Sequence, residues 1–179
     1  PRAPPPAHAP PAPSRPDGDP AIGVSAPRAG SERCLASRGA WPRILTMRAT
    51  PYCRLAVWDE TPNPLKRLVP RSLTEVEFDA NSLGAPHLGH IVENSITQLA
   101  LWQTAETETD VTLITGHSVR DLVQSAEYAT VTLDDGSQLQ AQLVVGADGA
   151  MSRVRELAGI GVTRDQYEQQ ALVISARYR

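Results

Sequence analysis

The chain has 179 residues, of which 41% are hydrophobic, and a formal net charge of -3 at pH 7. This length can hold one domain with a real hydrophobic core. Charges of both signs are interspersed and no basic run exceeds two residues, which argues against nucleic acid as the main partner. No apolar stretch approaches the roughly 18 to 20 residues that span a bilayer. We therefore expect no transmembrane segment and a cytoplasmic location.

The first segment, residues 1–20, reads PRAPPPAHAPPAPSRPDGDP. Proline lacks a backbone donor and fixes φ, so this segment cannot keep a helical or sheet ladder, and it offers little apolar surface to bury. We predict a disordered or polyproline-like segment, with a proline-rich ligand for an SH3-type partner as the alternative. The chain begins with Pro1 rather than methionine, so we expect a fragment or an out-of-frame start.

From Ala21 onward the pattern becomes globular and opens with helical features. Residues 31–38 carry helix formers and end at Gly39, a residue typical of helix C-termini. Pro42 is placed to open a second short helical turn. We therefore predict two short helices in this region.

Two strands are predicted next. Residues 54–60 and 73–80 alternate between apolar and polar side chains, as strands with one buried face do. The prolines of the segment 61–72 between them indicate a loop.

The stretch SITQLALWQTAE predicts a longer helix. Ser95 and Gln98 have the spacing of a capping box, in which each side chain satisfies a free backbone donor. Ile96, Leu99 and Ala100 would share one apolar face, which would pack against the core.

A short strand at 110–115 and then a hairpin are predicted after this helix. The hairpin strands, 129–133 and 138–149, flank DDGS, and Asp-Gly favours a tight turn because glycine accepts positive φ. The second strand ends in the continuous apolar run 143–145, which suggests a strand covered on both faces.

A helix over 150–158 and a final strand over 170–179 complete the expected elements. Hairpins alternate with strand-helix units in this order. We predict an α/β or mixed α+β fold.

Asp148 stands between Gly146 and Gly149 where the expected strand meets this helix. Asp148, Ser152 and Arg155 are offset by four and three residues, so they would share one helical face. A helix N-terminus at a strand end suits a phosphate or ribose-bearing ligand, and Arg155 could contact a pyrophosphate. Alternatively, Asp148 only caps the helix and Arg155 pairs with it.

The cysteines and two of the histidines carry no metal pattern. Cys34 and Cys53 match no zinc spacing and fit a reducing compartment. His87 and His90 flank a glycine before IVEN, and as metal ligands they would need a third partner at a fitting distance. We expect loop histidines and no metal.

The stretch VVGADGAMSRVRELAGI resembles the DGxxSxxR motif of the class A flavoprotein aromatic hydroxylases, the para-hydroxybenzoate hydroxylase-like monooxygenases. Three further blocks, GAWPRILTMRATPYCRLAVWD, LGHIVENSITQLALWQ and ELAGIGVTRDQYEQQALV, resemble the ubiquinone-biosynthesis branch of that family. The resemblance covers residues 22–179, and the ordered, separated blocks make it specific.

The resemblance implies a partial glutathione-reductase-like fold that binds FAD and NAD(P)H over residues 21–179. Residues 51–80 and about 168–179 would contribute to the sheet of a substrate domain. Members of this branch hydroxylate a polyprenyl phenol or benzoquinol ring with FAD, NAD(P)H and O2, so no side-chain nucleophile is expected. The resemblance also implies peripheral contact with the inner membrane and a ubiquinone-biosynthesis complex as a partner.

Five residues match positions that contact the cofactor in the family. Asp148 and Gly149 would lie by the FAD pyrophosphate and the route of the nicotinamide cofactor. Arg155 would hold the motif together or contact phosphate. Gln98 would contact the flavin, with its capping role as an equally good account, and Val119 would lie near the adenine.

The chain also departs from the family pattern. No GxGxxG occurs, so the N-terminal βαβ unit is expected to be missing. Gly23 stands where an arginine should contact the flavin, Met151 replaces a usual asparagine, and the later GD motif would lie beyond Arg179.

We therefore predict a fragment of an FAD-dependent ubiquinone-pathway hydroxylase, inactive by itself. One alternative is a non-catalytic remnant or interaction module whose unpaired sheet edges associate. Another is a related monooxygenase with a different aromatic substrate.

Overall fold

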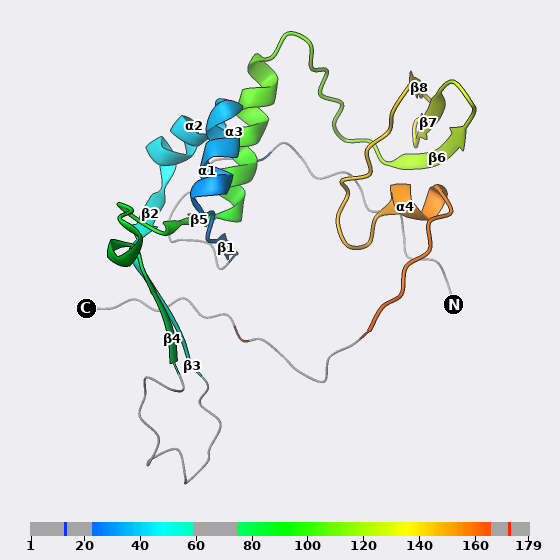
Figure 1. The fold of residues 1–179 in the computed structure, drawn as a ribbon. Helices are drawn as coiled ribbons and strands as arrows, with labels where there is room; N and C mark the ends of the chain where they lie inside the picture. Colours follow the sequence, from blue (N-terminus) through cyan, green and yellow to red (C-terminus); the bar gives the residue numbers. More distant parts are fainter. Residues whose placement is uncertain (1–12, 14–22, 59–74, 166–171, 173–179) are drawn as a thin grey trace. The chain divides into compact units, whose positions relative to one another are not determined.

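The computed structural model describes residues 13, 23–58, 75–165 and 172 (Figure 1). Contacts divide these residues between two compact units, Pro13–Thr112 and Leu113–Leu172, called here the N-terminal unit and the C-terminal unit. The predictions for 1–20, for the loop 61–72 and for the final strand 170–179 fall almost wholly outside the described residues.

The N-terminal unit packs three helices against a small antiparallel sheet (Figure 1). Its helices are α1 (Ala29–Ser37), α2 (Ala40–Met47) and α3 (Asn94–Thr107). Its sheet has the order β1-β5-β2, with β1 (Val24–Ser25), β5 (Gly89–Glu93) and β2 (Ala49–Tyr52). A separate ribbon pairs β3 (Arg54–Trp58) with β4 (Glu75–Asp79), followed by the 3-10 turn η3 (Asn81–Leu83).

The core of this unit lies where α2, α3 and β5 meet. Its buried residues are Ala40, Ile44, Val92, Ile96 and Ala100. The residues from each helix are four positions apart, so they lie on one face and pack together. The apolar face predicted for α3 is confirmed, because Ile96, Leu99 and Ala100 are buried.

The capping box predicted at the start of α3 is wrong. β5 runs directly into α3, so Glu93 takes the cap position and the helix begins at Asn94. Ser95 therefore lies inside the helix, and its buried hydroxyl has no hydrogen-bond partner within the described structure. The two predicted short helices are present, and Gly39 joins them with a φ of 76°. Pro42 lies in the first turn of α2, where an N-H has no intrahelical acceptor.

Gly89 allows a close backbone crossing between the start of β5 and the segment before α1. The His90 amide donates to the Pro27 carbonyl at 3.0 Å, and Arg28 forms an isolated bridge with Gly89. A Cβ atom at Gly89 would lie 2.3 Å from the Pro27 carbonyl oxygen. Any side chain at this position would push the two segments apart.

The C-terminal unit is a three-stranded meander with one short helix. The strands β6 (Val119–Gln124), β7 (Ala129–Leu133) and β8 (Gln138–Ala141) pair in chain order, and α4 spans Arg153–Leu157. The predicted hairpin is confirmed, and Gly136 supplies the positive φ, 87°, that its turn needs. Every pairing among the described strands is antiparallel, so this part of the chain is α+β.

One predicted strand is absent, and another is shorter than the predicted 138–149. Residues 110–115 are irregular, and β8 ends at Ala141, so the run 143–145 is not a strand. Leu143 and Val145 are 77% and 74% exposed. A strand requires a neighbour for its hydrogen-bond ladder, and no described strand pairs with this run. The last helix is also shorter than the predicted 150–158, because a turn occupies residues before Ser152.

We predict that Gly89→Ala lowers the free energy of unfolding by roughly 1–3 kcal/mol, because the new methyl group meets backbone rather than a movable side chain. Urea denaturation of the chain measures this loss. Gly30→Ala is the matched control, since a Cβ at Gly30 in α1 has no atom within 4 Å. Because alanine is favoured in helices, the control should be neutral or stabilising. Equal stability of the two variants would contradict the claim that the crossing leaves no room for a Cβ atom at residue 89.

Candidate functional site

Asp148 fastens the turn after residue 145 to the first turn of α4. Its carboxylate accepts hydrogen bonds from the Ser152 hydroxyl and from the backbone amides of Arg153, at 2.6 Å, and Val154, at 3.1 Å. The Ser152 hydroxyl oxygen in turn accepts from the Arg155 amide at 3.0 Å. The capping role considered for Asp148 is therefore present in the structure.

The two glycines around Asp148 serve different purposes. Gly149 has a φ of 88°, and a Cβ there would meet nothing within 4 Å, so the backbone conformation favours glycine. A Cβ at Gly146 would lie 3.1 Å from Val154 Cγ1, so at that position the reason is close packing. Together they let the chain fold back onto α4.

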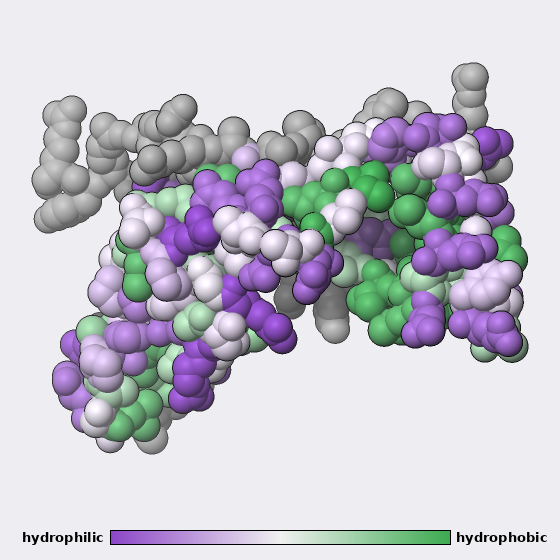
Figure 2. Space-filling view, turned by 90° about the horizontal axis from the view of Figure 1, so that it is seen from above, coloured by the Kyte–Doolittle hydropathy of each residue, from purple (hydrophilic) through white to green (hydrophobic). Residues whose placement is uncertain are grey.

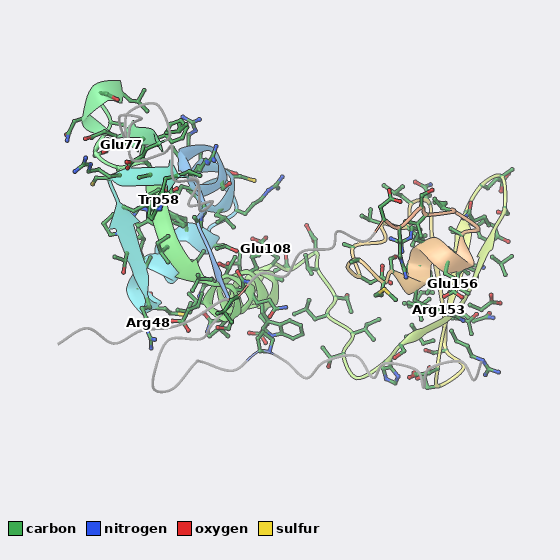
Figure 3. All side chains as sticks on the ribbon, turned by 90° about the horizontal axis from the view of Figure 1, so that it is seen from below. Arg48, Trp58, Glu77, Glu108, Arg153 and Glu156 are labelled. Carbon is green, nitrogen blue, oxygen red and sulfur yellow. The ribbon has the colours of Figure 1, made fainter. Side chains whose placement is uncertain are left out.

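The electrostatics of the turn follow from these contacts. The Ser152 hydrogen bond, helped by the amides of Val154 and Arg153 and opposed by slight burial, holds the pKa of Asp148 below its ordinary value. Arg155 does not pair with Asp148; its guanidinium donates to the Ala150 carbonyl at 2.9 Å. The predicted Asp148–Arg155 ion pair is therefore wrong. On the same helix, Arg153 and Glu156 pair at 2.9 Å (Figure 3).

A hollow of about 510 Å³ opens beside this turn. Figure 2 shows apolar side chains of the C-terminal unit gathered around it. Its polar and glycine lining includes Gly146, Gly149, Ser152 and Arg155, and its apolar walls include Leu122, Tyr128, Val144 and Ile160. Gly149 and Arg155 thus share one cavity, whereas Asp148 does not line it.

Gln98 and Val119 lie elsewhere. Val119 begins β6 and pairs with Leu133, and it does not line the hollow. Gln98 belongs to α3 in the N-terminal unit, where it lines a second hollow of about 710 Å³ with Ser25 and Asn94. Of the five predicted site residues, the structure brings only Gly149 and Arg155 together in one hollow. Asp148 is next to Gly149 in the chain and binds the first turn of α4 instead.

Gly23 lies next to this second hollow. Its carbonyl accepts from the Asn94 amide at 2.9 Å, and the Ser25 hydroxyl donates to Asn94 Oδ1 at 2.5 Å. A Cβ at Gly23 would make ordinary contact, 3.5 Å, with Asn94 Nδ2. The structure therefore has room for a Cβ atom at the position where the resemblance leads us to expect an arginine.

A cluster that sequence reasoning missed lies inside the N-terminal unit. Glu32 of α1 contacts both His87 and His90, which are 55 and 58 residues further along the chain. Burial raises the pKa of Glu32, but hydrogen bonds and charge interactions with His87 and His90 outweigh it, so the pKa is lowered overall. The histidines were noticed in the sequence, but nothing local identifies Glu32 as their partner.

The chain matches the FAD binding domain family over residues 31–178. It belongs to this family. The resemblance inferred from the sequence blocks is thereby confirmed. Among the described residues, no helix combines the length and apolar character needed to cross a membrane.

Relatives with assigned names narrow the family. The chain is 40% identical over 171 residues to the 3-demethoxyubiquinol 3-hydroxylase of Escherichia coli (strain K12), which covers 95% of this chain and 41% of that protein. It is 34% identical over 159 residues to the ubiquinone biosynthesis monooxygenase COQ6 of Mus musculus, covering 84% of this chain and 31% of the relative. The chain therefore spans less than half the length of these relatives.

Solved structures agree on the fold. A variant of P. aeruginosa PqsL superimposes with a TM-score of 0.63 at 19% identity, over 87% of this chain and 40% of that one. The Diels-Alderase PyrE3 gives a TM-score of 0.55 at 23% identity, over 83% and 27%.

We predict that Asp148→Ala destabilises the chain by about 1 kcal/mol at neutral pH, because three hydrogen bonds to the carboxylate are lost. The folded-state pKa of Asp148 is lowered, so its contribution is present above the unfolded pKa of about 3.9 and declines as pH falls through the folded value. As the pH falls from neutral through the folded-state pKa, urea unfolding should show the stabilities of the wild-type chain and of Asp148→Ala converging. Asp110→Ala, at an exposed position, is the control. A stability difference that persists after Asp148 is protonated in the folded chain would contradict the capping role.

Proposed function

We propose that the chain is part of an FAD-dependent monooxygenase that hydroxylates a polyprenyl phenol or benzoquinol ring in ubiquinone biosynthesis, with NAD(P)H and O2 as co-substrates. The observation that carries this proposal is the 40% identity, over 95% of the chain, to a protein named as a 3-demethoxyubiquinol 3-hydroxylase. Identity to COQ6, named as a ubiquinone biosynthesis monooxygenase, supports the same branch.

The first hollow suits the pyrophosphate of FAD. Arg155 uses one guanidinium N-H on the Ala150 carbonyl, and its other donors can meet a phosphate by charge-assisted hydrogen bonds. Gly149 has no Cβ to keep a ligand away from the backbone. The Asp148 carboxylate is occupied by Ser152, Arg153 and Val154, and its negative charge would repel phosphate. Asp148 is therefore a positioning residue in this proposal.

Gln98 stays the proposed flavin contact, and it lies on the second hollow. Gln98, Asn94 and Ser25 line it, and their amide and hydroxyl groups match the hydrogen-bonding needs of a flavin ring edge or its polyol chain. A contact between Val119 and the adenine stays part of the proposal, supported only by its place at the start of β6. FAD supplies the redox and oxygen chemistry when bound, and the protein orients it and excludes water.

The ribbon β3-β4 suits a place in a larger sheet. Leu55 faces Phe78 and Val57 faces Val76 across the pair, so all four side chains lie on one face. These side chains are between 39% and 58% exposed. The opposite face is mixed: Arg54 is bonded to Glu77, and Ala56 and Trp58 lie on the same side. An apolar ribbon face of this kind supports the proposed contribution of residues 51–80 to a substrate-domain sheet.

Polyprenyl substrates partition into lipid, so the proposed activity would bring the full-length protein to the surface of the inner membrane. Participation in a ubiquinone-biosynthesis complex belongs to the same proposal.

The activity is tested with the full-length protein, FAD, NAD(P)H and a short-chain prenylated phenol or demethoxyquinol. We expect substrate to stimulate NAD(P)H oxidation and mass spectrometry to detect a product with one added oxygen atom, labelled when ¹⁸O2 is supplied. Oxidation of NAD(P)H that yields only hydrogen peroxide with every quinol and phenol of this class would overturn the substrate assignment. Hydroxylation of an unrelated aromatic ring would favour the alternative monooxygenase.

The phosphate contact has a matched pair of arginines on α4. In the full-length protein, Arg155→Gln should weaken FAD binding roughly 10- to 100-fold, the effect of losing a hydrogen bond to a charged group. Arg153→Gln should leave it unchanged, because Arg153 pairs with Glu156 and does not line the hollow. Flavin fluorescence titration measures both affinities. Equal FAD affinity of the two variants would remove Arg155 from the cofactor site.

A further inference from the structure

Glu32, His87 and His90 form the most enclosed group of potential metal ligands among the described residues. Glu32 Oε1 lies 2.7 Å from His90 Nδ1, and Glu32 Oε2 lies 3.0 Å from His87 Nε2. Their side chains are 11%, 10% and 25% exposed for Glu32, His90 and His87. The structure thus supplies the third partner that the two histidines lacked in the sequence.

The spacing of the ligand atoms is close to that of a zinc site. The three atoms all lie within 4.8 Å of one another. Zinc binds histidine nitrogen and carboxylate oxygen at about 2.0–2.2 Å in tetrahedral geometry, which puts neighbouring ligand atoms roughly 3.3–3.5 Å apart. The two carboxylate-imidazole contacts would have to open by roughly 0.3–0.8 Å to admit the ion.

We propose that Glu32, His87 and His90 bind one Zn²⁺ ion, with a fourth coordination position left for water or another ligand. Two imidazoles and one carboxylate select zinc and similar first-row divalent ions over Mg²⁺ and Ca²⁺, which prefer oxygen ligands alone. The ion would take the place of the two hydrogen bonds between the carboxylate and the imidazoles. Glu32 would remain ionised, and the positive charge of the ion would balance its negative charge inside the N-terminal unit.

The ligands are held in place before any ion binds. The Glu32 amide donates to the Arg28 carbonyl at 2.9 Å, and the His90 amide donates to the Pro27 carbonyl at 3.0 Å. The two ligand-bearing segments are therefore tied to adjacent residues of one short stretch. Such support lowers the ordering cost of binding.

Aromatic contacts orient the imidazole rings. The Trp41 and His90 rings meet in a T-shaped arrangement with centroids 5.1 Å apart, and the His87 and His90 rings do so with centroids 4.6 Å apart. Rings fixed in this way keep the bonded nitrogens directed at Glu32. The site joins α1 to the start of β5, so bound zinc would stabilise the N-terminal unit.

The C-terminal unit contains a natural comparison. His117, Asp134 and Asp135 also gather three ligand atoms, but their side chains are 36%, 40% and 45% exposed and include a single imidazole. Exposed clusters of this kind are common without a metal. We therefore use His117→Asn as the control for weak surface binding.

The test uses the full chain stripped of metal with a chelator. Calorimetric titration with Zn²⁺ should give one equivalent of binding, and Co²⁺ substituted for zinc should give the intense visible bands of a four- or five-coordinate site. Glu32→Gln and His87→Asn should each weaken zinc binding more than about 10-fold, the minimum cost seen even for residues outside the first ligand shell. His117→Asn should bind zinc as the wild-type chain does.

Three results would overturn the proposal. The first is zinc binding that Glu32→Gln and His87→Asn do not change, or that His117→Asn abolishes. The second is a cobalt spectrum of weak octahedral bands, which the wild-type chain alone reveals even if a variant fails to fold. The third is a thiolate-to-cobalt charge-transfer band, which would put Cys34 or Cys53 on the metal. None of these outcomes depends on FAD binding or hydroxylation, so the metal site and the proposed function fail separately.

Discussion

The N-terminal unit depends on the backbone crossing at Gly89. The crossing brings Pro27 within hydrogen-bonding distance of His90 and leaves no room for a Cβ atom. On one side of it, α1 starts at Ala29 and presents Glu32 to the two histidines. On the other side, β5 continues into α3 and carries Asn94 and Gln98 to the second hollow. The close crossing that Gly89 allows therefore positions both the Glu32–His87–His90 cluster and the second hollow.

The DG turn shows how a helix cap could also support the proposed ligand site. The two interpretations of Asp148 seemed exclusive from spacing alone, because a carboxylate that caps a helix is not free to bind. In the structure the cap occupies the carboxylate, and by doing so it fixes Gly149 and Arg155 on the hollow. A phosphate accepts hydrogen bonds and carries negative charge, so it would be recognised by backbone and guanidinium donors rather than by the Asp148 carboxylate.

Local patterns predicted local structure well. The apolar period of α3 and the Asp-Gly turn of the β7-β8 hairpin depend on neighbours within a few residues, and both are confirmed. The capping box was wrong because the preceding strand decides where α3 starts. The extension of the second hairpin strand through 143–145 was wrong, because an apolar run becomes a strand only beside a pairing partner. Family resemblance supplied the proposed site residues, whereas the partner of His87 and His90 could be identified only from the tertiary structure.

The buried cluster and the second hollow are coupled through α1. Ser31, Cys34 and Leu35 of this helix line the hollow, and Glu32 of the same helix turns toward the histidines. Zinc bound by Glu32 would fix the rotation and position of α1 relative to β5, because two of its ligands precede or belong to that strand. Zinc would thereby restrict the positions that the α1 residues lining the second hollow can take. If α1 is already ordered when a ligand arrives, less conformational entropy is lost on binding. Zinc would therefore favour ligand binding in the second hollow without contacting the ligand.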